Sequence, residues 1–301
     1  MTTNQIKLII KTIRPSFLLL TPICVLLGLS TAIATGSPIN SIDFLLILLG
    51  AMSAHISVNT LNEYYDFKTG LDFNTVKTPF SGGSGALPTA PELAIKVLIV
   101  GIVSLAITSI IGLYFLAKFG FTLLPIGLIG IILIMTYTQW VNRLPLTCLI
   151  SPGLGFGVLM VVGTHIVLTG FHAVLPWLVS LIPFFLINNL LLLNQYPDIE
   201  ADKSVGRKTF PISYGLQKSN LIFVVFAIAT VLSIIYLVAQ QYITWISLLA
   251  LLPLTLSFYA YVGANKHKSR IQQYPKFMAA NVISALLTPL VLGVSILINY
   301  I

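Results

Sequence analysis

The stretch NTLNEYYDFKTGLDFNTVKTPFSGGSG, residues 59–85, begins inside an apolar run and carries three carboxylates within ten residues. A second stretch, NQYPDIEADKSVGRK at residues 194–208, repeats this arrangement in the second half of the chain. Both are conspicuous because only 8% of the residues are charged, whereas 57% are hydrophobic. Six of the eight acidic residues belong to these two stretches. The carboxylates are therefore concentrated at two places in an otherwise apolar chain.

The rest of the chain predicts an integral membrane protein. Its mean hydropathy is +0.98, and its charged content lies far below the roughly 25% of a soluble domain. Apolar segments of about 20 residues, enough to cross a bilayer core of roughly 30 Å, recur along all 301 residues. The first apolar run is long and has no small-residue cleavage site after it, so no cleavable signal peptide is expected. We expect an all-α, polytopic membrane helix bundle forming a single domain, residues 1–301, with nine transmembrane helices at residues 16–36, 41–65, 92–117, 121–139, 149–169, 173–196, 220–240, 243–262 and 278–299.

The distribution of basic residues predicts the orientation of this bundle. With nine spans, fifteen of the sixteen Lys and Arg residues lie on the side of the N-terminus, and only Lys118 lies on the other side. The positive-inside rule then predicts a cytoplasmic N-terminus, in the plasma or inner membrane if the protein is bacterial. The net charge of +8 follows from this topology and gives no reason to expect nucleic acid as a partner. Cys24 and Cys148 are expected to be free thiols.

The first acidic stretch predicts a polar stripe at the end of a membrane helix. Spacings of 4, 3 and 4 residues place one set of side chains on a single helical face: His55, Asn59, Asn62 and Asp66. Such a stripe should face the bundle interior or a water-filled cavity, because lipid would penalise it by several kcal/mol. Asp72 lies off the stripe, but a helix end at Gly70 would let the following turn bring it back towards Asp66.

The second acidic stretch has a matching pattern. Asn194, Asp198 and Asp202 are spaced at i, i+4 and i+8, and Pro197 among them predicts that the helix is kinked or restarts there. Either stretch alone could be a solvated helix end with capping carboxylates. Two matching N-x-x-x-D clusters, both on the basic side and both flanked by Lys or Arg, favour one shared site.

Two facing clusters of oxygen ligands suit a hard divalent ion. Mg²⁺ typically takes one or two carboxylates together with substrate phosphate oxygens, so two clusters could clamp a diphosphate between them. Nearby Lys or Arg would neutralise the remaining phosphate charge. An allylic chain on that diphosphate could then ionise in a water-poor cavity, where aromatic faces stabilise a carbocation. A membrane location fits a substrate whose tail is too apolar for water.

At this point the residues resemble a known family. The segments NEYYDFKTGLD and DIEADKSVGRKT, set within nine predicted spans, resemble the UbiA superfamily of intramembrane prenyltransferases, and IRPSF at residues 13–17 resembles the start of that family's first helix. The six-residue separation of Asp66 and Asp72 is most similar to the branch that prenylates 1,4-dihydroxy-2-naphthoate in menaquinone biosynthesis. The resemblance implies Mg²⁺-dependent transfer of a polyprenyl group from its diphosphate to an aromatic acceptor, with the active site at the cytoplasmic side.

The resemblance also implies roles for individual residues. The implied catalytic residues are Asn62, Asp66, Asn194 and Asp198. The implied Mg²⁺ ligands are Asn62, Asp66 and Asp72 for one ion, and Asn194, Asp198 and Asp202 for the other. The implied diphosphate contacts are Arg14, Lys77, Arg143 and Arg207. His55 and Tyr137 are candidates to contact the acceptor, although a packing role for His55 is an equally good interpretation. The SGGSG run, residues 81–85, would belong to a cap over the cavity or would be a flexible connector.

The sequence departs from the family pattern at three places. Glu63 stands where the family often has Asp, and it keeps the charge but reaches further. A Tyr-x-x-x-Lys element is common after the fourth span, but here Val141 occupies the lysine position and Arg143 follows two residues later. The naphthoate branch commonly shows Gly-Leu-Gly-Glu near the fifth span, where this chain has Phe156 in place of the glutamate. These departures leave the reaction class intact and the acceptor open.

Other functions remain possible at this level. Acidic residues within spans are also typical of transporters and channels, although here they gather at one face, and the outer half of the bundle offers almost no charge to continue a path across the membrane. A phosphatidyl-alcohol synthase would show a D-G-x-x-A-R run, which is absent from the sequence. A prenyltransferase with another acceptor, such as 4-hydroxybenzoate, is a further alternative.

Overall fold

The computed structural model describes residues 2–75, 77–78 and 80–299, and this part of the chain consists of helices and connecting loops without a β-strand. The α-helices are α1 (Thr3–Thr12), α2 (Pro15–Leu18), α3 (Leu20–Ala34), α4 (Ser41–Lys68), α5 (Leu71–Asn74), α6 (Ala86–Thr89), α7 (Ala94–Phe119), α8 (Leu124–Thr136), α9 (Pro145–Pro152), α10 (Met160–Thr169), α11 (Val174–Asn194), α12 (Ile199–Ser204), α13 (Phe210–Ala239), α14 (Leu251–His267) and α15 (Pro275–Ile298). Short 3₁₀ segments connect several of them, and a π-helical segment, η4 (Gly153–Leu159), joins α9 to α10.

The membrane-spanning prediction is confirmed in its coarse form. Within the described residues, eight helical segments are long and apolar enough to cross a bilayer. The apolar helix at residues 121–136 corresponds to the remaining predicted span but is shorter. Helix α13 is interrupted at Gly215 (φ 79°), and the span predicted at residues 220–240 lies in the long part that follows this break.

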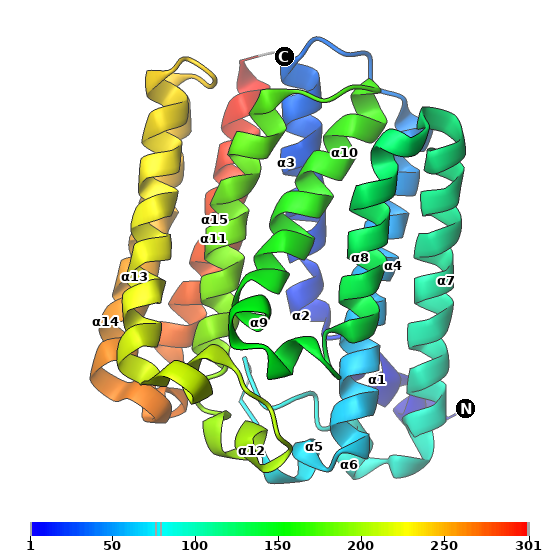
Figure 1. The fold of residues 1–301 in the computed structure, drawn as a ribbon, viewed down its shortest axis with the longest axis vertical. Helices are drawn as coiled ribbons and strands as arrows, with labels where there is room; N and C mark the ends of the chain where they lie inside the picture. Colours follow the sequence, from blue (N-terminus) through cyan, green and yellow to red (C-terminus); the bar gives the residue numbers. More distant parts are fainter. Residues whose placement is uncertain (1, 76, 79, 300–301) are drawn as a thin grey trace.

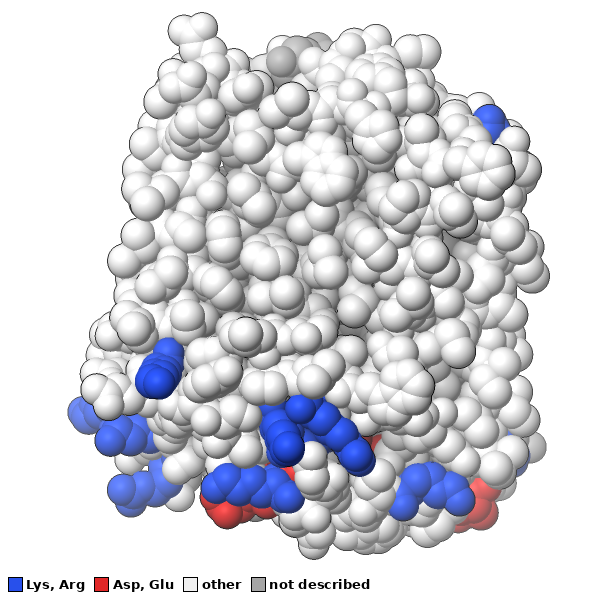
Figure 2. All heavy atoms as spheres, in the orientation of Figure 1, with Lys and Arg blue, Asp and Glu red and all other residues white. Residues whose placement is uncertain are grey.

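The long helices run side by side, and the short helices α1, α5, α6 and α12 gather at one end of the bundle (Figure 1). The N-terminus lies at that end and the C-terminus at the other. Figure 2 shows that most of the Lys and Arg side chains visible on this face also gather at the end with the short helices, which we call the charged end; one basic side chain lies near the opposite end. At the other end, Lys118 in the last turn of α7 pairs with the buried Asp43 of α4, with Nζ 2.6 Å from Oδ2.

Close helix packing holds this bundle together. Lipid is as apolar as the helices, so association depends on van der Waals contact and small residues rather than on removal of apolar surface from water. At Gly28 of α3, a Cβ atom would lie 2.6 Å from the Cβ of Thr164 in α10, so only glycine permits this approach. Helix α11 lies in the interior, where Ile182 and Leu186 are fully buried. The helices therefore form a rigid framework for the side chains that they carry.

One irregular element lies beside the site. In η4 the backbone is widened, and the Met160 N–H bonds to the Gly155 carbonyl five residues earlier. Asn188 of α11 stabilises the start of this segment, because its side-chain oxygen accepts a hydrogen bond from the Gly153 N–H at 2.6 Å. Such π-helical turns occur mostly within α-helices and frequently at functional sites.

Candidate active site

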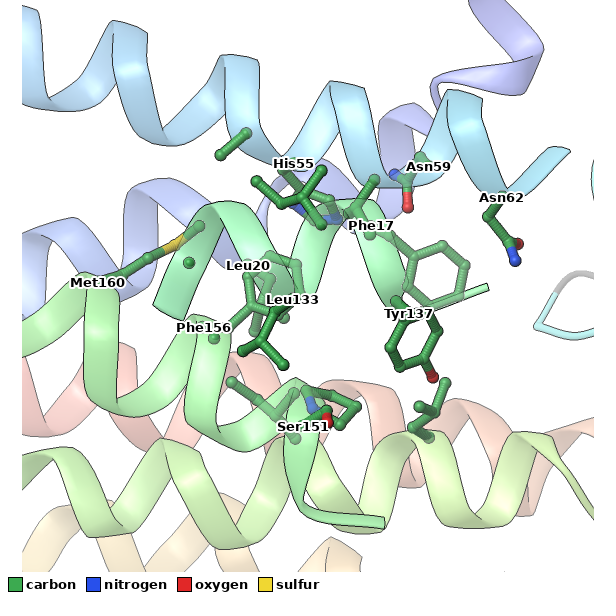
Figure 3. A pocket seen from close by; sticks show the side chains of 18 of the residues that line it. Phe17, Leu20, His55, Asn59, Asn62, Leu133, Tyr137, Ser151, Phe156 and Met160 are labelled. Atoms are coloured by element: carbon green, nitrogen blue, oxygen red, sulfur yellow. The ribbon is translucent and has the colours of Figure 1, made fainter. Parts of the chain in front are cut away.

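A cavity of about 470 Å³ extends from the charged end into the bundle. Both acidic stretches contribute to its lining, through Asn62, Asp66, Asp72, Asn194, Asp198 and Asp202. The whole predicted stripe of α4 also lines it, and Figure 3 shows His55, Asn59 and Asn62 on the cavity side of that helix. The two stretches, far apart in the sequence, therefore meet across one cavity, as their matching patterns predicted.

The first cluster is shaped by the end of α4. The helix stops at Lys68, and Gly70 adopts a left-handed backbone (φ 80°) that begins the turn into α5. This turn brings Asp72 to the same cavity as Asp66. The helix end predicted at Gly70 is confirmed, and its consequence for Asp72 follows from the left-handed conformation that glycine adopts without a steric penalty.

The second cluster is shaped by a helix that stops and restarts. Helix α11 ends at Asn194, and α12 begins at Ile199 with Asp198 at its N-cap position. Of the two possibilities predicted from Pro197, a kink or a restart, the structure has the restart. Asp202 lies one turn further along α12 and is buried. The three polar residues therefore belong to two helices and the turn between them.

Arg207 connects the two clusters. One of its terminal nitrogens, Nη2, contacts Asp66 Oδ1, and the other, Nη1, lies 2.9 Å from Asp202 Oδ1. Because both nitrogens belong to one guanidinium group, the two carboxylates lie at a single site. Asp66 and Asp202 are both buried, so removing the guanidinium would leave two buried negative charges close together.

Two other carboxylates of the site each have one oxygen without a hydrogen-bond partner. Asp72 Oδ2 and Asp198 Oδ1 are buried and have no hydrogen-bond partner among the described residues. Burial raises the pKa of Asp72 to about 7, with a further contribution from the charges of Glu63 and Asp66. Burial likewise raises the pKa of Asp198 to about 7, assisted by the charge of Asp202. Because both residues also line the cavity, these oxygens are available to bind a cation there.

The donor set suits Mg²⁺ when substrate oxygens complete it. No three of the described His, Cys, Asp and Glu side chains converge closely enough to hold a metal ion by themselves. The oxygens available are carboxylates of both clusters, together with the amides of Asn62 and Asn194, which line the same cavity. Mg²⁺ prefers such oxygen ligands and usually binds through one or two carboxylates plus phosphate oxygens. The residues present therefore fit the ion.

Glu63 has a role that the sequence did not reveal. Its side chain is fully buried, its Oε1 lies 2.7 Å from Arg14 Nη2, and it accepts hydrogen bonds from the backbone and hydroxyl of Ser84. Arg14 also donates to Asn62 Oδ1 at 3.4 Å and lines the cavity. Glu63 thus positions a cavity arginine and the glycine-rich loop at once. In the sequence, the only indication of this role was that the Glu63 side chain is longer than the Asp that the family often has at this position.

Arg14 is held in an unusual backbone conformation. Its φ of 55° places it in the left-handed region, immediately before Pro15, where a non-glycine residue is uncommon. Asn59 helps to fix this segment, because its side-chain nitrogen donates to the Ile13 carbonyl at 2.8 Å. Strained backbone of this kind clusters at ligand-binding sites, which agrees with the prediction that Arg14 contacts the ligand.

The SGGSG loop lies against the carboxylates. Gly82 and Gly83 line the same cavity as Asp72 and Asp198. At Gly83 (φ 72°), a Cβ would come within 2.7 Å of Asp72 Oδ1, so the close approach and the left-handed backbone both require glycine. The position of this loop matches the cap interpretation better than that of a free connector.

Two predicted diphosphate contacts lie outside this cavity. Among the described residues, neither Lys77 nor Arg143 belongs to its lining. Lys77 is exposed, and Arg143 lines a smaller adjacent pocket of about 260 Å³ that also includes Asp66 and Arg207. Arg143 is placed there because Val141–Arg143 form a separate 3₁₀ turn after α8, which sequence spacing alone could not show.

The middle of the cavity is apolar and aromatic. His55 is buried, with Nδ1 2.8 Å from Thr21 Oγ1, and its ring lies edge-on to Phe156 at a centroid distance of 4.4 Å. It lies 11 residues from Asp66, about 16 Å along a straight helix. Tyr137 lies closer to the carboxylates, and Figure 3 shows its ring beside that of Phe17, opposite Asn62. Phe17 is a cavity residue that the sequence had indicated only through IRPSF.

Comparison with known proteins places the chain in a family. The model of the UbiA prenyltransferase family matches residues 21–283. A 1,4-dihydroxy-2-naphthoate octaprenyltransferase of Bacillus subtilis (strain 168) is 30% identical over 194 residues, which span 62% of this chain and only 60% of that protein.

Two solved structures show the same fold. A UbiA homologue from Archaeoglobus fulgidus bound to GPP and Mg²⁺ has a TM-score of 0.66 and 18% identity, covering 96% of this chain and 99% of that one. The apo UbiA homologue from Aeropyrum pernix K1 has a TM-score of 0.68 and 16% identity, covering 93% and 98%. The family match extends over most of the chain, and the cavity with its paired acidic clusters lies within that fold. The chain therefore belongs to the UbiA prenyltransferase family.

Proposed function

We propose that this protein transfers a polyprenyl group from its diphosphate to an aromatic acceptor in the membrane, in a reaction that depends on Mg²⁺. The observation that carries the proposal is that two acidic stretches meet across one cavity whose deeper part is apolar. The charged mouth suits a diphosphate and the apolar interior suits its tail. A homologue of the same fold has been solved with GPP and Mg²⁺, which supports this choice of ligands.

The residues at the charged end of the cavity form two groups. One group would bind Mg²⁺, and the other would bind the phosphate oxygens. Asn62, Asp66 and Asp72 would hold one Mg²⁺, and Asn194, Asp198 and Asp202 the other. When bound, the ions would neutralise the diphosphate and make it a better leaving group. Arg14 and Arg207, which already contact the clusters, would bind the remaining phosphate oxygens.

The cavity walls would then protect the cation. The bond between the prenyl C1 and the diphosphate oxygen breaks, and its electron pair leaves with the diphosphate. The allylic cation forms beside Phe17 and Tyr137, whose ring faces attract positive charge. A new carbon–carbon bond forms with the acceptor ring, which then loses a proton. The apolar lining excludes the water that would otherwise capture the cation.

A 1,4-dihydroxy-2-naphthoate-type acceptor, and hence a role in menaquinone biosynthesis, is the preferred assignment. The Bacillus subtilis relative carries that name, and the Asp66–Asp72 spacing agrees with it. Phe156, which replaces the carboxylate common in that branch, packs against His55. This pair would offer an aromatic surface to the acceptor or to the first part of the tail.

The membrane arrangement forms part of the proposal. A single domain would cross the membrane nine times, with the segment at residues 121–136 as the shortest crossing. The charged end, and with it the active site, would face the cytoplasm. The orientation follows from the one-sided distribution of Lys and Arg, and the number of crossings from the apolar length of the segments.

A transfer assay tests this function. Purified protein in liposomes is given radiolabelled polyprenyl diphosphate, with 1,4-dihydroxy-2-naphthoate or 4-hydroxybenzoate, with and without Mg²⁺. We expect label in a lipid-soluble product only when Mg²⁺ and one of the acceptors are present. Absence of product with either acceptor, together with solute flux that survives Asp66→Ala and Asp198→Ala, would instead indicate a transporter.

A further inference from the structure

The deeper half of the cavity is lined by glycines that leave space open. Gly112 on α7 and Gly127 and Gly130 on α8 all belong to the lining. A Cβ added at Gly112 or Gly127 would meet no atom within 4 Å, and one at Gly130 would only reach Leu159 Cδ1 at 3.8 Å. These glycines therefore do not serve close helix packing, which is the usual reason for glycine in a membrane helix.

The structure provides a direct contrast within the same bundle. At Gly101 of α7, a Cβ would approach Leu61 Cδ2 to 2.9 Å, and at Gly157 it would approach the Phe184 nitrogen to 2.6 Å. Those two glycines allow neighbouring helices to touch. Gly112, Gly127 and Gly130 instead leave the channel wide, although glycine stabilises a helix less than alanine does.

Their depth can be measured along the helices. Asn62 Nδ2 donates to Thr138 Oγ1 at 3.2 Å, so these two residues define a common level near the charged end. Gly130 and Gly127 lie 8 and 11 residues from Thr138, or about 12 and 16 Å deeper. Ile111, next to Gly112, lies against Gly50, which is 12 residues or about 18 Å deeper than Asn62. The glycines thus border successive depths of one channel.

Helix α8 separates this channel from the membrane. It has no buried residue, and side chains such as Leu128 and Ile132 are about half exposed on its outer side. One face of the helix borders the cavity through Gly127, Gly130 and Tyr137, and the other faces lipid. The width of the channel at α8 is therefore determined by the residues on its inner face.

We infer that Gly112, Gly127 and Gly130 determine the longest prenyl chain that the protein accepts, because they keep the tail channel open at three depths. This inference rests on the proposed prenyl transfer. A larger side chain at any of the three would block the channel at its own depth. Chains that end above the block would still bind, whereas longer chains would not.

The test compares chain lengths. Wild-type protein, Gly130→Leu, Gly127→Leu and Gly112→Leu are each assayed with a series of prenyl diphosphates from two isoprene units upwards. We expect the variants to keep wild-type turnover with the shortest substrates and to lose at least tenfold in kcat/KM beyond a cut-off. The cut-off should fall at a shorter chain for Gly130→Leu than for Gly127→Leu or Gly112→Leu.

One control separates this effect from general damage. Leu128→Phe adds bulk to the lipid-facing side of the same helix and should leave the range of substrates unchanged. If the leucine variants lose all chain lengths equally, or keep the wild-type range, the inference is overturned. If wild-type protein transfers no prenyl group at all, the proposed function itself fails.

Discussion

The two ends of the bundle hold their buried charges in different ways. At the end opposite the site, Asp43 and Lys118 form an ion pair in which both carboxylate oxygens lie within 2.8 Å of one ammonium group. At the charged end, Asp66 and Asp202 share one arginine, while Asp72 and Asp198 each retain a buried oxygen without a partner. A completed pair joins two helices. An incomplete cluster has capacity left for a ligand, and this distinguishes the site from a structural contact.

The largest expected effect comes from removing carboxylates at the charged end. Asp66→Ala and Asp198→Ala should each lower prenyl transfer by several orders of magnitude, because the ions that activate the diphosphate would be lost. The protein should still insert and fold, because Arg207 keeps Asp202 as a partner when Asp66 is removed, and because removing Asp198 relieves its repulsion with Asp202. Transfer assays and Tm in detergent check both statements. A collapse of Tm together with activity would show that these carboxylates are structural.

Removing the buried charge at the opposite end of the bundle should lower stability and leave activity nearly unchanged. Asp43→Asn breaks the pair with Lys118 and should lower Tm by about a few degrees, because a partner is lost at the α4–α7 contact. Prenyl transfer should stay within about twofold of wild type. If Asp43→Asn abolished transfer with an unchanged Tm, the distinction between the two ends would be wrong.

Smaller losses of activity are expected on replacing Arg207 and Arg143, and the two losses should differ in size. Arg207→Ala removes hydrogen bonds to two buried carboxylates. The change would also remove the proposed contact with the diphosphate. One hydrogen bond between charged groups contributes about 1.5–3 kcal/mol, so a loss of about 10- to 150-fold in kcat/KM is expected. Arg143→Ala should raise only the KM for the prenyl diphosphate, by a few fold, since Arg143 lines the adjacent pocket. An unchanged KM in Arg143→Ala would remove this residue from diphosphate binding.

The pH dependence should reveal the incomplete cluster. Mg²⁺ binding requires ionised carboxylates, and the pKa values of Asp72 and Asp198 are raised to about 7 by burial. Protons should therefore compete with the metal as the pH falls through 7. For one linked proton, the Mg²⁺ concentration for half-maximal activity should rise about tenfold between pH 8 and pH 6. A Mg²⁺ requirement independent of pH would contradict this assignment.

Without Mg²⁺, the folded protein should become less stable as the pH rises. Between pH 4 and pH 7 the folded protein keeps protons on Asp72 and Asp198 that the unfolded chain has released, since their folded pKa values exceed the ordinary 3.8. Stability should therefore fall as the pH rises through this window. Thermal melts without Mg²⁺ should give a higher Tm at pH 5 than at pH 8. Asp72→Asn combined with Asp198→Asn should reduce this difference.

Much of the fold and the core of the site could be predicted from the sequence. Apolar length identified the membrane helices, and the spacing of Asn62 and Asp66 gave the face that lines the cavity, because both depend only on local periodicity. The position of Asp72 could be anticipated because Gly70 interrupts the helix.

What could not be predicted depends on contacts between distant segments. Arg207 lies between Asp66 and Asp202, Glu63 holds Arg14, and Arg143 lies beside the main cavity rather than in it. The π-helical segment after Pro152 is stabilised by Asn188, and no pattern within residues 145–169 indicates it. Side-chain partners across a bundle are determined by the packing of helices, which a single sequence does not specify.

The central statement is that the two acidic clusters bind one ligand together. Equilibrium binding of an unreactive polyprenyl thiodiphosphate in the presence of Mg²⁺, compared between wild type, Asp66→Asn, Asp198→Asn and the double variant, tests it most directly. If the ligand bridges both clusters, each single change should lower affinity strongly and the double variant should be little weaker than either one, because neighbouring groups that act as a unit are not additive. Losses that simply multiply in the double variant would mean that the clusters act independently, and the shared site would be contradicted.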